Sequence, residues 1–189
     1  MRSCGGASFA PSAPMPRSMS EPEALYENRD CIVVSKPAGL LTHGVRRRRR
    51  PGAERVDEPT LAAWLRARYP ELSSVGDDPA TRPGLVHRLD RDTSGVVLVA
   101  RSNESFLYFK HLFQTRAVRK EYAALVWGAV ARSAGTIESP IGLIHGKTKR
   151  TTVVTRARLV KEAVTDYAVE RRLTFDGTPL TLLAVFPKT

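Results

Sequence analysis

The sequence predicts an α+β fold in which a mixed, mostly antiparallel β-sheet is flanked by helices. Both helical patterns lie before residue 120, and the segments after it are rich in β-forming residues. These later segments follow one another without helices between them, which favours antiparallel or mixed pairing over a doubly wound sheet. With 189 residues, of which 42% are hydrophobic, the chain is long enough for one domain with a sizeable core.

Residues 1–20 are predicted to form a disordered leader, and the folded domain is predicted over 21–189. The leader carries no acidic residue and is rich in Ser, Pro, Ala and Gly, a composition that cannot assemble a core. The absence of acidic residues, with Ser and Arg present, is also compatible with a transit peptide. A plain flexible leader or a misplaced start codon is the alternative explanation.

Apolar runs and chain breakers predict the elements of the first half. Leu25–Tyr26 and Cys31–Val34 have the composition of strands, and the breaker Lys36-Pro-Ala-Gly39 follows the second. Thr60 is expected to cap a helix that runs to Tyr69, before Pro70. Two further segments are predicted to be loops: Arg46–Arg50, whose like charges repel, and Glu71–Pro83.

A buried strand and an amphipathic helix are predicted next. Val96–Ala100 is a short apolar run rich in Val, which is typical of a buried strand. Ser102 or Asn103 then caps a helix whose Phe106, Phe109 and Phe113 recur at i, i+3 and i+7. Exposed aromatic rings can stack on bases, but this stripe coincides with the buried face, so we expect core packing. Four more β-rich segments follow: Lys120–Trp127, Thr151–Thr155, Val164–Glu170 and Leu180–Phe186.

The charge of the chain favours a polyanionic partner. Thirty Lys and Arg residues against 19 Asp and Glu give a formal charge of +11 and an isoelectric point near 10.3. No apolar run approaches the roughly 20 residues that span a bilayer. Cys4 and Cys31 supply no disulfide framework, and the histidines show no metal-ligand spacing. Nucleic acid is the leading candidate for the partner. We expect a monomer with no metal and no membrane, in a reducing compartment: the cytoplasm of a bacterium, or a mitochondrion or plastid.

The loop that enters the predicted strand at Val96 carries a candidate nucleophile, Asp90. It lies between Arg88 and Arg91, whose guanidinium charges favour an ionised carboxylate. An aspartate is already anionic at neutral pH and can attack an electrophilic carbon without a base to activate it. The alternative is a surface network of Arg and Asp side chains, worth at most about 1 kcal/mol per exposed pair.

Other chemistries have weaker support in the sequence. Gly142–Thr148 ends in Gly-Lys-Thr, but its glycines are one residue too close for a phosphate-binding P-loop. Ser94 and His87 could belong to a catalytic triad, although Ser94 lacks the Gly-x-Ser-x-Gly elbow. Neither nucleotide hydrolysis nor serine catalysis is therefore indicated.

A family resemblance joins these segments. Arg82-Pro-Gly-Leu-Val-His-Arg-Leu-Asp-Arg-Asp-Thr-Ser-Gly95 closely resembles the signature of RluA-type RNA pseudouridine synthases. The segment Leu25–His43 is similar to the opening strand and Lys-Pro-x-Gly segment of that family, and Lys120-Glu-Tyr122 is similar to its Lys-x-Tyr strand. The likeness covers about residues 24–189, and Arg46–Glu58 is the least typical part.

The resemblance implies isomerisation of uridine to pseudouridine in structured RNA (rRNA or tRNA), without a cofactor. By analogy, Asp90 would be the nucleophile, attacking the ribose C1′ or the base C6. Tyr122 would stack on the uracil and help to remove the C5 proton, and Arg88 would occupy the space that the flipped base vacates. A base inside a helix must be extruded before its glycosidic bond is reachable.

One departure from the family pattern concerns the last residues. In the family, the strand corresponding to Leu180–Phe186 continues into Pro-x-Thr-Gly-Arg-x-His-Gln, whose arginine pairs with the nucleophile. The given sequence stops at Pro187-Lys-Thr189, and Lys188 does not occupy the position of that arginine. We therefore expect a C-terminally truncated catalytic domain, either a fragment of an active enzyme or a short product with weak turnover. The alternative function is a catalytically impaired module that still binds RNA.

Overall fold

The computed structural model describes residues 20–44, 58–145 and 150–189. The chain divides into two compact units, Met1–Gln114 and Thr115–Thr189. Helices and antiparallel sheets confirm the predicted α+β class. Residues 1–19 of the predicted leader and the arginine run 46–50 lie outside the described residues.

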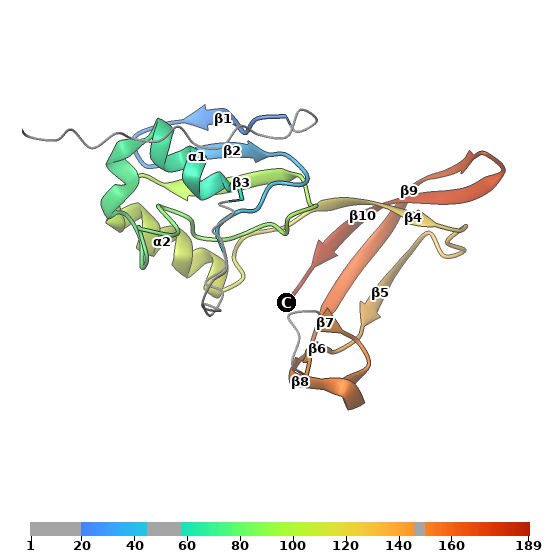
Figure 1. Cartoon of the computed structure of the whole chain (residues 1–189). Helices are drawn as coiled ribbons and strands as arrows, with labels where there is room; N and C mark the ends of the chain where they lie inside the picture. The colour runs from blue at the N-terminus through green and yellow to red at the C-terminus, as the bar shows by residue number, and fades with distance from the viewer. Residues whose placement is uncertain (1–19, 45–57, 146–149) are drawn as a thin grey trace, which may run out of the picture. The chain divides into compact units, whose positions relative to one another are not determined.

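A three-stranded antiparallel sheet forms the centre of the first unit (Figure 1). Its strands are β1 (Glu23–Glu27), β2 (Cys31–Lys36) and β3 (Gly95–Ala100), in that order across the sheet. Side chains alternate between the faces of a strand, so Ile32, Val34 and Lys36 of β2 share one face, and all three are fully buried. Val97 and Val99 of β3 are also fully buried. This core supports the segment that leads into β3.

Two helices complete the first unit, and both begin at caps that the sequence predicted. Helix α1 (Leu61–Arg68) starts after Thr60, whose hydroxyl accepts a hydrogen bond from Ala63 N at 3.0 Å. Helix α2 (Asn103–Gln114) is capped by Ser102, whose Oγ accepts from Ser105 N at 3.1 Å. A 3₁₀ helix (Pro70–Ser74) follows α1, so the predicted loop Glu71–Pro83 was wrong over its first four residues.

The second unit consists mainly of strands, and the β9–β10 hairpin has the longest of them (Figure 1). Asp176 and Gly177, with φ of 47° and 72°, make its two-residue turn. Positive φ at both positions matches the twist of the flanking strands, and Asp-Gly suits such a turn. One sheet has the order β4-β10-β9-β5, and a smaller one has the order β7-β6-β8. The strands are β4 (Tyr122–Trp127), β5 (Ala134–Glu138), β6 (Ile141–Ile144), β7 (Arg150–Thr151), β8 (Ala157–Lys161), β9 (Val164–Phe175) and β10 (Thr178–Pro187).

Two strand predictions in this unit need correction. Only Thr151 of the predicted segment Thr151–Thr155 lies in a strand, and Val154–Arg156 forms a short 3₁₀ helix instead. Lys120 precedes β4, which begins at Tyr122. Local β propensity favoured these residues, but Val153 and Val154 are exposed and no sheet packing holds them extended.

Candidate active-site loop

Gly84 sets the backbone path at the start of the loop that carries Asp90. Its amide donates to Val75 O and its carbonyl accepts from Ala100 N, both at 2.9 Å. With φ at +64°, it adopts a conformation that favours glycine, and a Cβ there would collide with Ala100 O. The loop is therefore tied to β3 before it reaches Asp90.

Leu89 fixes the backbone immediately before Asp90. Its side chain is buried, and its amide and carbonyl both bond to the hydroxyl of Thr42. The Thr42 hydroxyl donates to Leu89 O at 2.6 Å and accepts from Leu89 N at 3.3 Å. These bonds hold the main chain at a buried point next to an exposed carboxylate.

Asp90 itself is exposed, and no hydrogen bond or ion pair joins its carboxylate to another residue in the parts of the chain that the structure describes. The neighbouring Arg91 is paired elsewhere, with Glu58 at 2.6 Å. A carboxylate that is accessible, and held on an anchored backbone, is available to a substrate. The surface Arg–Asp network that was the alternative is therefore not formed by Asp90 with these arginines.

Lys36 anchors the residue that follows Asp90. Its fully buried ammonium donates to Pro37 O and Leu40 O, each at 2.8 Å, and to Arg91 O at 3.0 Å. Burial lowers the pKa of Lys36, and the charges of Asp92 and Asp90 oppose that shift. In the sequence, Lys36 stands at the start of the chain breaker Lys36-Pro-Ala-Gly39, and no contact with the Asp90 loop was predicted for it. The two-residue period of β2 could have indicated that Lys36 is buried, because it places Lys36 on the same face as Ile32 and Val34.

Arg88 is exposed and contacts a buried histidine. One guanidinium nitrogen lies 3.2 Å from His43 Nε2, and His43 Nδ1 lies 3.0 Å from Gly44 O. A guanidinium only donates, so Nε2 is the acceptor and Nδ1 carries the proton that is donated to Gly44 O. Burial is the main cause that lowers the pKa of His43, and the charges of Arg82 and Arg88 add to it. A neutral His43 thus orients Arg88.

His87, in the same loop, has a structural environment. Its Nε2 accepts a hydrogen bond from Leu98 N at 2.9 Å, and its ring stacks on Phe113 at 4.5 Å. Burial lowers its pKa to about 4, so the ring is neutral near pH 7. The predicted aromatic stripe of α2 packs inward here: Phe106 is buried, and Phe109 and Phe113 are half-buried.

Tyr122 belongs to the second unit, where it begins β4 and pairs with Val185 of β10. It is half-buried. Asp90 and Arg88 lie two residues apart in one loop of the first unit. Asp90 and Arg88 thus lie in the first unit and Tyr122 lies in the second.

Two further findings concern ligands and membranes. Within residues 20–44, 58–145 and 150–189, no three His, Cys, Asp or Glu side chains gather to hold a metal ion. In the same residues, no helix has the length and apolar character needed to cross a membrane.

Comparisons with known proteins show what the chain resembles. A family model described as RNA pseudouridylate synthase matches residues 30–189. An uncharacterized RNA pseudouridine synthase of Aquifex aeolicus is 37% identical over 161 residues, which are 85% of this chain and 46% of the relative. Ribosomal large subunit pseudouridine synthase D of Pseudomonas aeruginosa is 37% identical over 152 residues, which are 80% of this chain and 42% of the relative.

A solved structure gives the same match in three dimensions. Human RNA pseudouridylate synthase domain containing 1 superposes with a TM-score of 0.68 at 26% identity, covering 93% of this chain and 63% of the human chain. The chain thus spans slightly less than half the length of the two curated relatives.

Proposed function

Because the chain belongs to the RNA pseudouridylate synthase family, we propose that it isomerises uridine to pseudouridine in structured RNA, with Asp90 as the nucleophile. The observation that carries the assignment of the nucleophile is the accessible Asp90 carboxylate on a backbone anchored by Thr42 and Lys36. The Arg82–Gly95 segment, which resembles the RluA-type signature, lies inside the matched region.

The reaction conserves atoms and electrons. The N1–C1′ glycosidic bond breaks, the uracil turns, and a C5–C1′ bond forms; C5 loses a proton and N1 gains one. Asp90 attacks either the ribose C1′ or the base C6, and leaves again when the new bond is made. Each step is a nucleophilic or acid–base step, so the proposal requires no external oxidant or reductant.

Two other residues have proposed roles in the reaction. The Tyr122 ring stacks on the uracil and its hydroxyl assists removal of the C5 proton. Arg88 fills the space that the extruded base leaves, and its contact with His43 holds the guanidinium oriented before RNA arrives.

The RNA class follows from charge and from relatives. A formal charge of +11 supports binding to a polyanion. The relatives from Pseudomonas aeruginosa and Vibrio cholerae are named for the large ribosomal subunit, which favours rRNA over tRNA as the substrate.

The test replaces the nucleophile. Asp90→Ala should lower release of tritium from RNA that contains C5-tritiated uridine by at least about 1,000-fold, because it removes the carboxylate that forms the proposed covalent intermediate. Binding to the same RNA should change little. Asp92→Ala, in the same exposed loop, is the control and should keep most of the turnover. Undiminished tritium release by Asp90→Ala would refute the assignment.

The cellular counterpart compares pseudouridine maps of RNA from cells with and without the gene. Sites that depend on the gene identify the substrate. Sites confined to tRNA would contradict the rRNA assignment, while sites that the Asp90→Ala gene restores would contradict the proposed nucleophile.

A further inference from the structure

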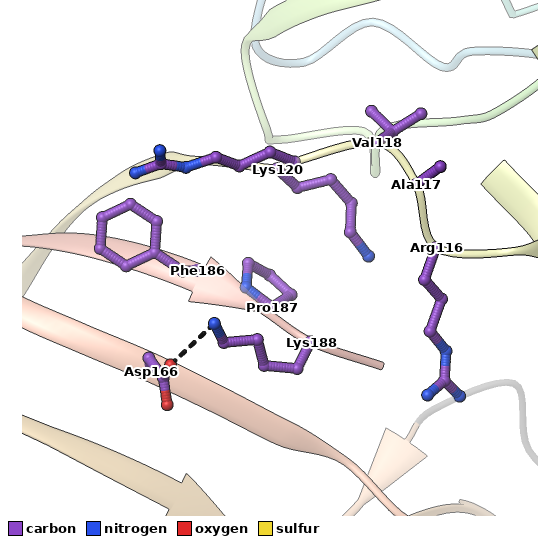
Figure 2. A pocket seen from close by; sticks show the side chains of 9 residues that line it. Arg116, Ala117, Val118, Lys120, Asp166, Phe186, Pro187 and Lys188 are labelled. Carbon is purple, nitrogen blue, oxygen red and sulfur yellow. Dashed lines mark ion pairs between the residues drawn. The ribbon is translucent and has the colours of Figure 1, made fainter. Parts of the chain in front are cut away.

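The second unit contains a pocket of about 390 Å³ that lies beside the start of β4 (Figure 2). One wall is the irregular segment 116–120, which leads into Tyr122. The other wall consists of Phe186 and Pro187 at the end of β10, Lys188 directly after it, and Asp166 of β9. All of these residues belong to the same unit.

The charge in this pocket is mostly positive. Its lining includes four cations, Arg116, Arg119, Lys120 and Lys188, and one carboxylate, that of Asp166. Asp166 pairs with Lys188 at 3.0 Å, and its Oδ1 accepts from the Thr136 hydroxyl at 2.8 Å. The Lys188 bond is the main cause that lowers the pKa of Asp166, and the Thr136 bond adds to it. The single carboxylate is thus ionised and already matched by one cation.

The other three cations have no carboxylate partner among the residues that the structure describes. The Arg119 guanidinium lies over the Phe186 ring, 5.7 Å from its centroid, a contact that restricts where the guanidinium can point. Lys120 is half-buried, and Figure 2 shows its side chain extending into the space between Pro187 and Arg116. The pocket therefore presents oriented positive charge that is not neutralised within the described chain.

We propose that this pocket binds a backbone phosphate of RNA, next to the nucleotide that Tyr122 contacts. The inference rests on the proposed function for its choice of polyanion. Two features favour a phosphodiester. Guanidinium groups match phosphate oxygens in geometry. The pocket also adjoins Tyr122: Lys120 lies two residues before it, and its strand partner Val185 directly precedes Phe186 of the pocket wall. Phosphate contacts of this kind fix the register of the RNA and carry no base preference.

The first experiment measures how salt weakens binding of a fluorescent RNA stem-loop with uridines in its loop. It uses the whole chain in an Asp90→Ala background, so that turnover does not enter. Each phosphate neutralised contributes about 0.7 to 0.9 to the slope of log affinity against log salt. Arg116→Gln/Arg119→Gln/Lys120→Gln should reduce the slope by about 0.8, the share of one phosphate, and the affinity at least about tenfold.

Matched controls separate this pocket from general charge. Arg132→Gln/Arg158→Gln removes exposed cations of the same unit outside the pocket and should leave the slope within about half a unit of the starting value. Arg119→Lys/Lys120→Arg keeps both charges and should retain most of the affinity. Circular dichroism checks that each variant keeps its secondary structure.

A substitution that removes the negative charge of the pocket is expected to strengthen RNA binding and gives a second test. Asp166→Asn removes the carboxylate and frees Lys188, so RNA should bind more tightly, by about threefold or more. Asp176→Asn, in the β9–β10 turn, also removes one negative charge but lies outside the pocket, and should have a smaller effect. Equal effects of the two substitutions would contradict the proposal.

Two results would overturn it outright. In the first, the triple pocket variant keeps the salt slope and the RNA affinity of the starting protein. In the second, inorganic phosphate shifts the amide resonances of 116–120 but the pocket substitutions leave RNA affinity unchanged, which would assign the pocket to a free anion. Failure of the proposed function would look different. The protein with Asp90 intact would then release no tritium, whatever the salt slopes of the variants.

Discussion

Lys36 ends β2 with no exposed surface, and its ammonium donates to two nearby carbonyl oxygens, of Pro37 and Leu40, and to the distant carbonyl of Arg91. Arg91 is 55 residues away along the chain, yet its backbone carbonyl is bonded to this ammonium. A buried charge is costly unless it is hydrogen-bonded, and here all three N–H bonds of the ammonium are used. Lys36 therefore connects the stability of the unit to the position of Asp90.

Replacement of Lys36 by Met keeps the length of the side chain and removes the donors. Pro37 O, Leu40 O and Arg91 O then lose a buried partner, so we expect the free energy of unfolding to fall by about 2 to 4 kcal/mol. Urea denaturation measures the loss, and amide hydrogen exchange at 91–93 should quicken. Lys110→Met, which breaks a surface pair with Asp77 and a contact with the Phe106 ring, should cost about 1 kcal/mol. Equal losses for both variants would contradict the role given to Lys36.

At the scale of elements, the loop 84–92 and β3 are joined by a titratable ring. His87 accepts from Leu98 N in its neutral form, and its pKa is lowered from 6.5 to about 4 by burial. The unfolded chain therefore takes up a proton as pH falls through 6.5, whereas the folded chain does so only near 4. The contribution of neutral His87 to the free energy of unfolding is therefore fully present above pH 6.5, and it is lost as the pH falls from 6.5 to about 4.

We expect the free energy of unfolding to fall by roughly 3 kcal/mol from this group between pH 6.5 and 4. His87→Gln can keep an acceptor for Leu98 N but cannot titrate, so its stability should depend less on pH in this window. Urea unfolding at several pH values measures both proteins, and parallel curves would refute the assignment.

The elements that the sequence predicted best have strong local signals. Helices α1 and α2 have hydroxyl caps, and β2 and β3 have apolar runs, which are all visible in short windows. Strands β5 and β8 went unpredicted because most of their side chains are exposed, so no alternation marks them. Their place is set by pairing with β9 and β6, which is a property of the assembled sheets.

The candidate site also has some features that a short segment of sequence indicates and others that depend on tertiary contacts. Asp90 and Arg88 were proposed from one continuous motif, and Tyr122 from a second; all three remain predictions. The contacts of Lys36 with Arg91 and of His43 with Arg88 could not be predicted from such motifs, because they join residues 55 and 45 positions apart. A sequence pattern identifies chemistry that lies in one segment, whereas the anchoring of that chemistry depends on tertiary contacts.

At the scale of the whole molecule, the charge of +11 and the site perform different tasks. Phosphate contacts supply most of the affinity for RNA without regard to sequence, and only groups that meet the base edges or the reacting atoms discriminate. In the proposed reaction, Asp90 would act on a carbon that is reached only after the base is extruded, so we expect it to add little to initial binding. Affinity and turnover should therefore respond to different changes in the RNA.

We accordingly expect a stem-loop whose loop uridines are replaced by cytidines to bind within about threefold of the original, because its phosphates are unchanged. It should give no pseudouridine. Both RNAs should lose affinity in parallel as salt rises, which fluorescence anisotropy measures directly. A large preference for the uridine loop that persists at high salt would contradict this division, since it would mean that base contacts, and not the charge of the molecule, dominate binding.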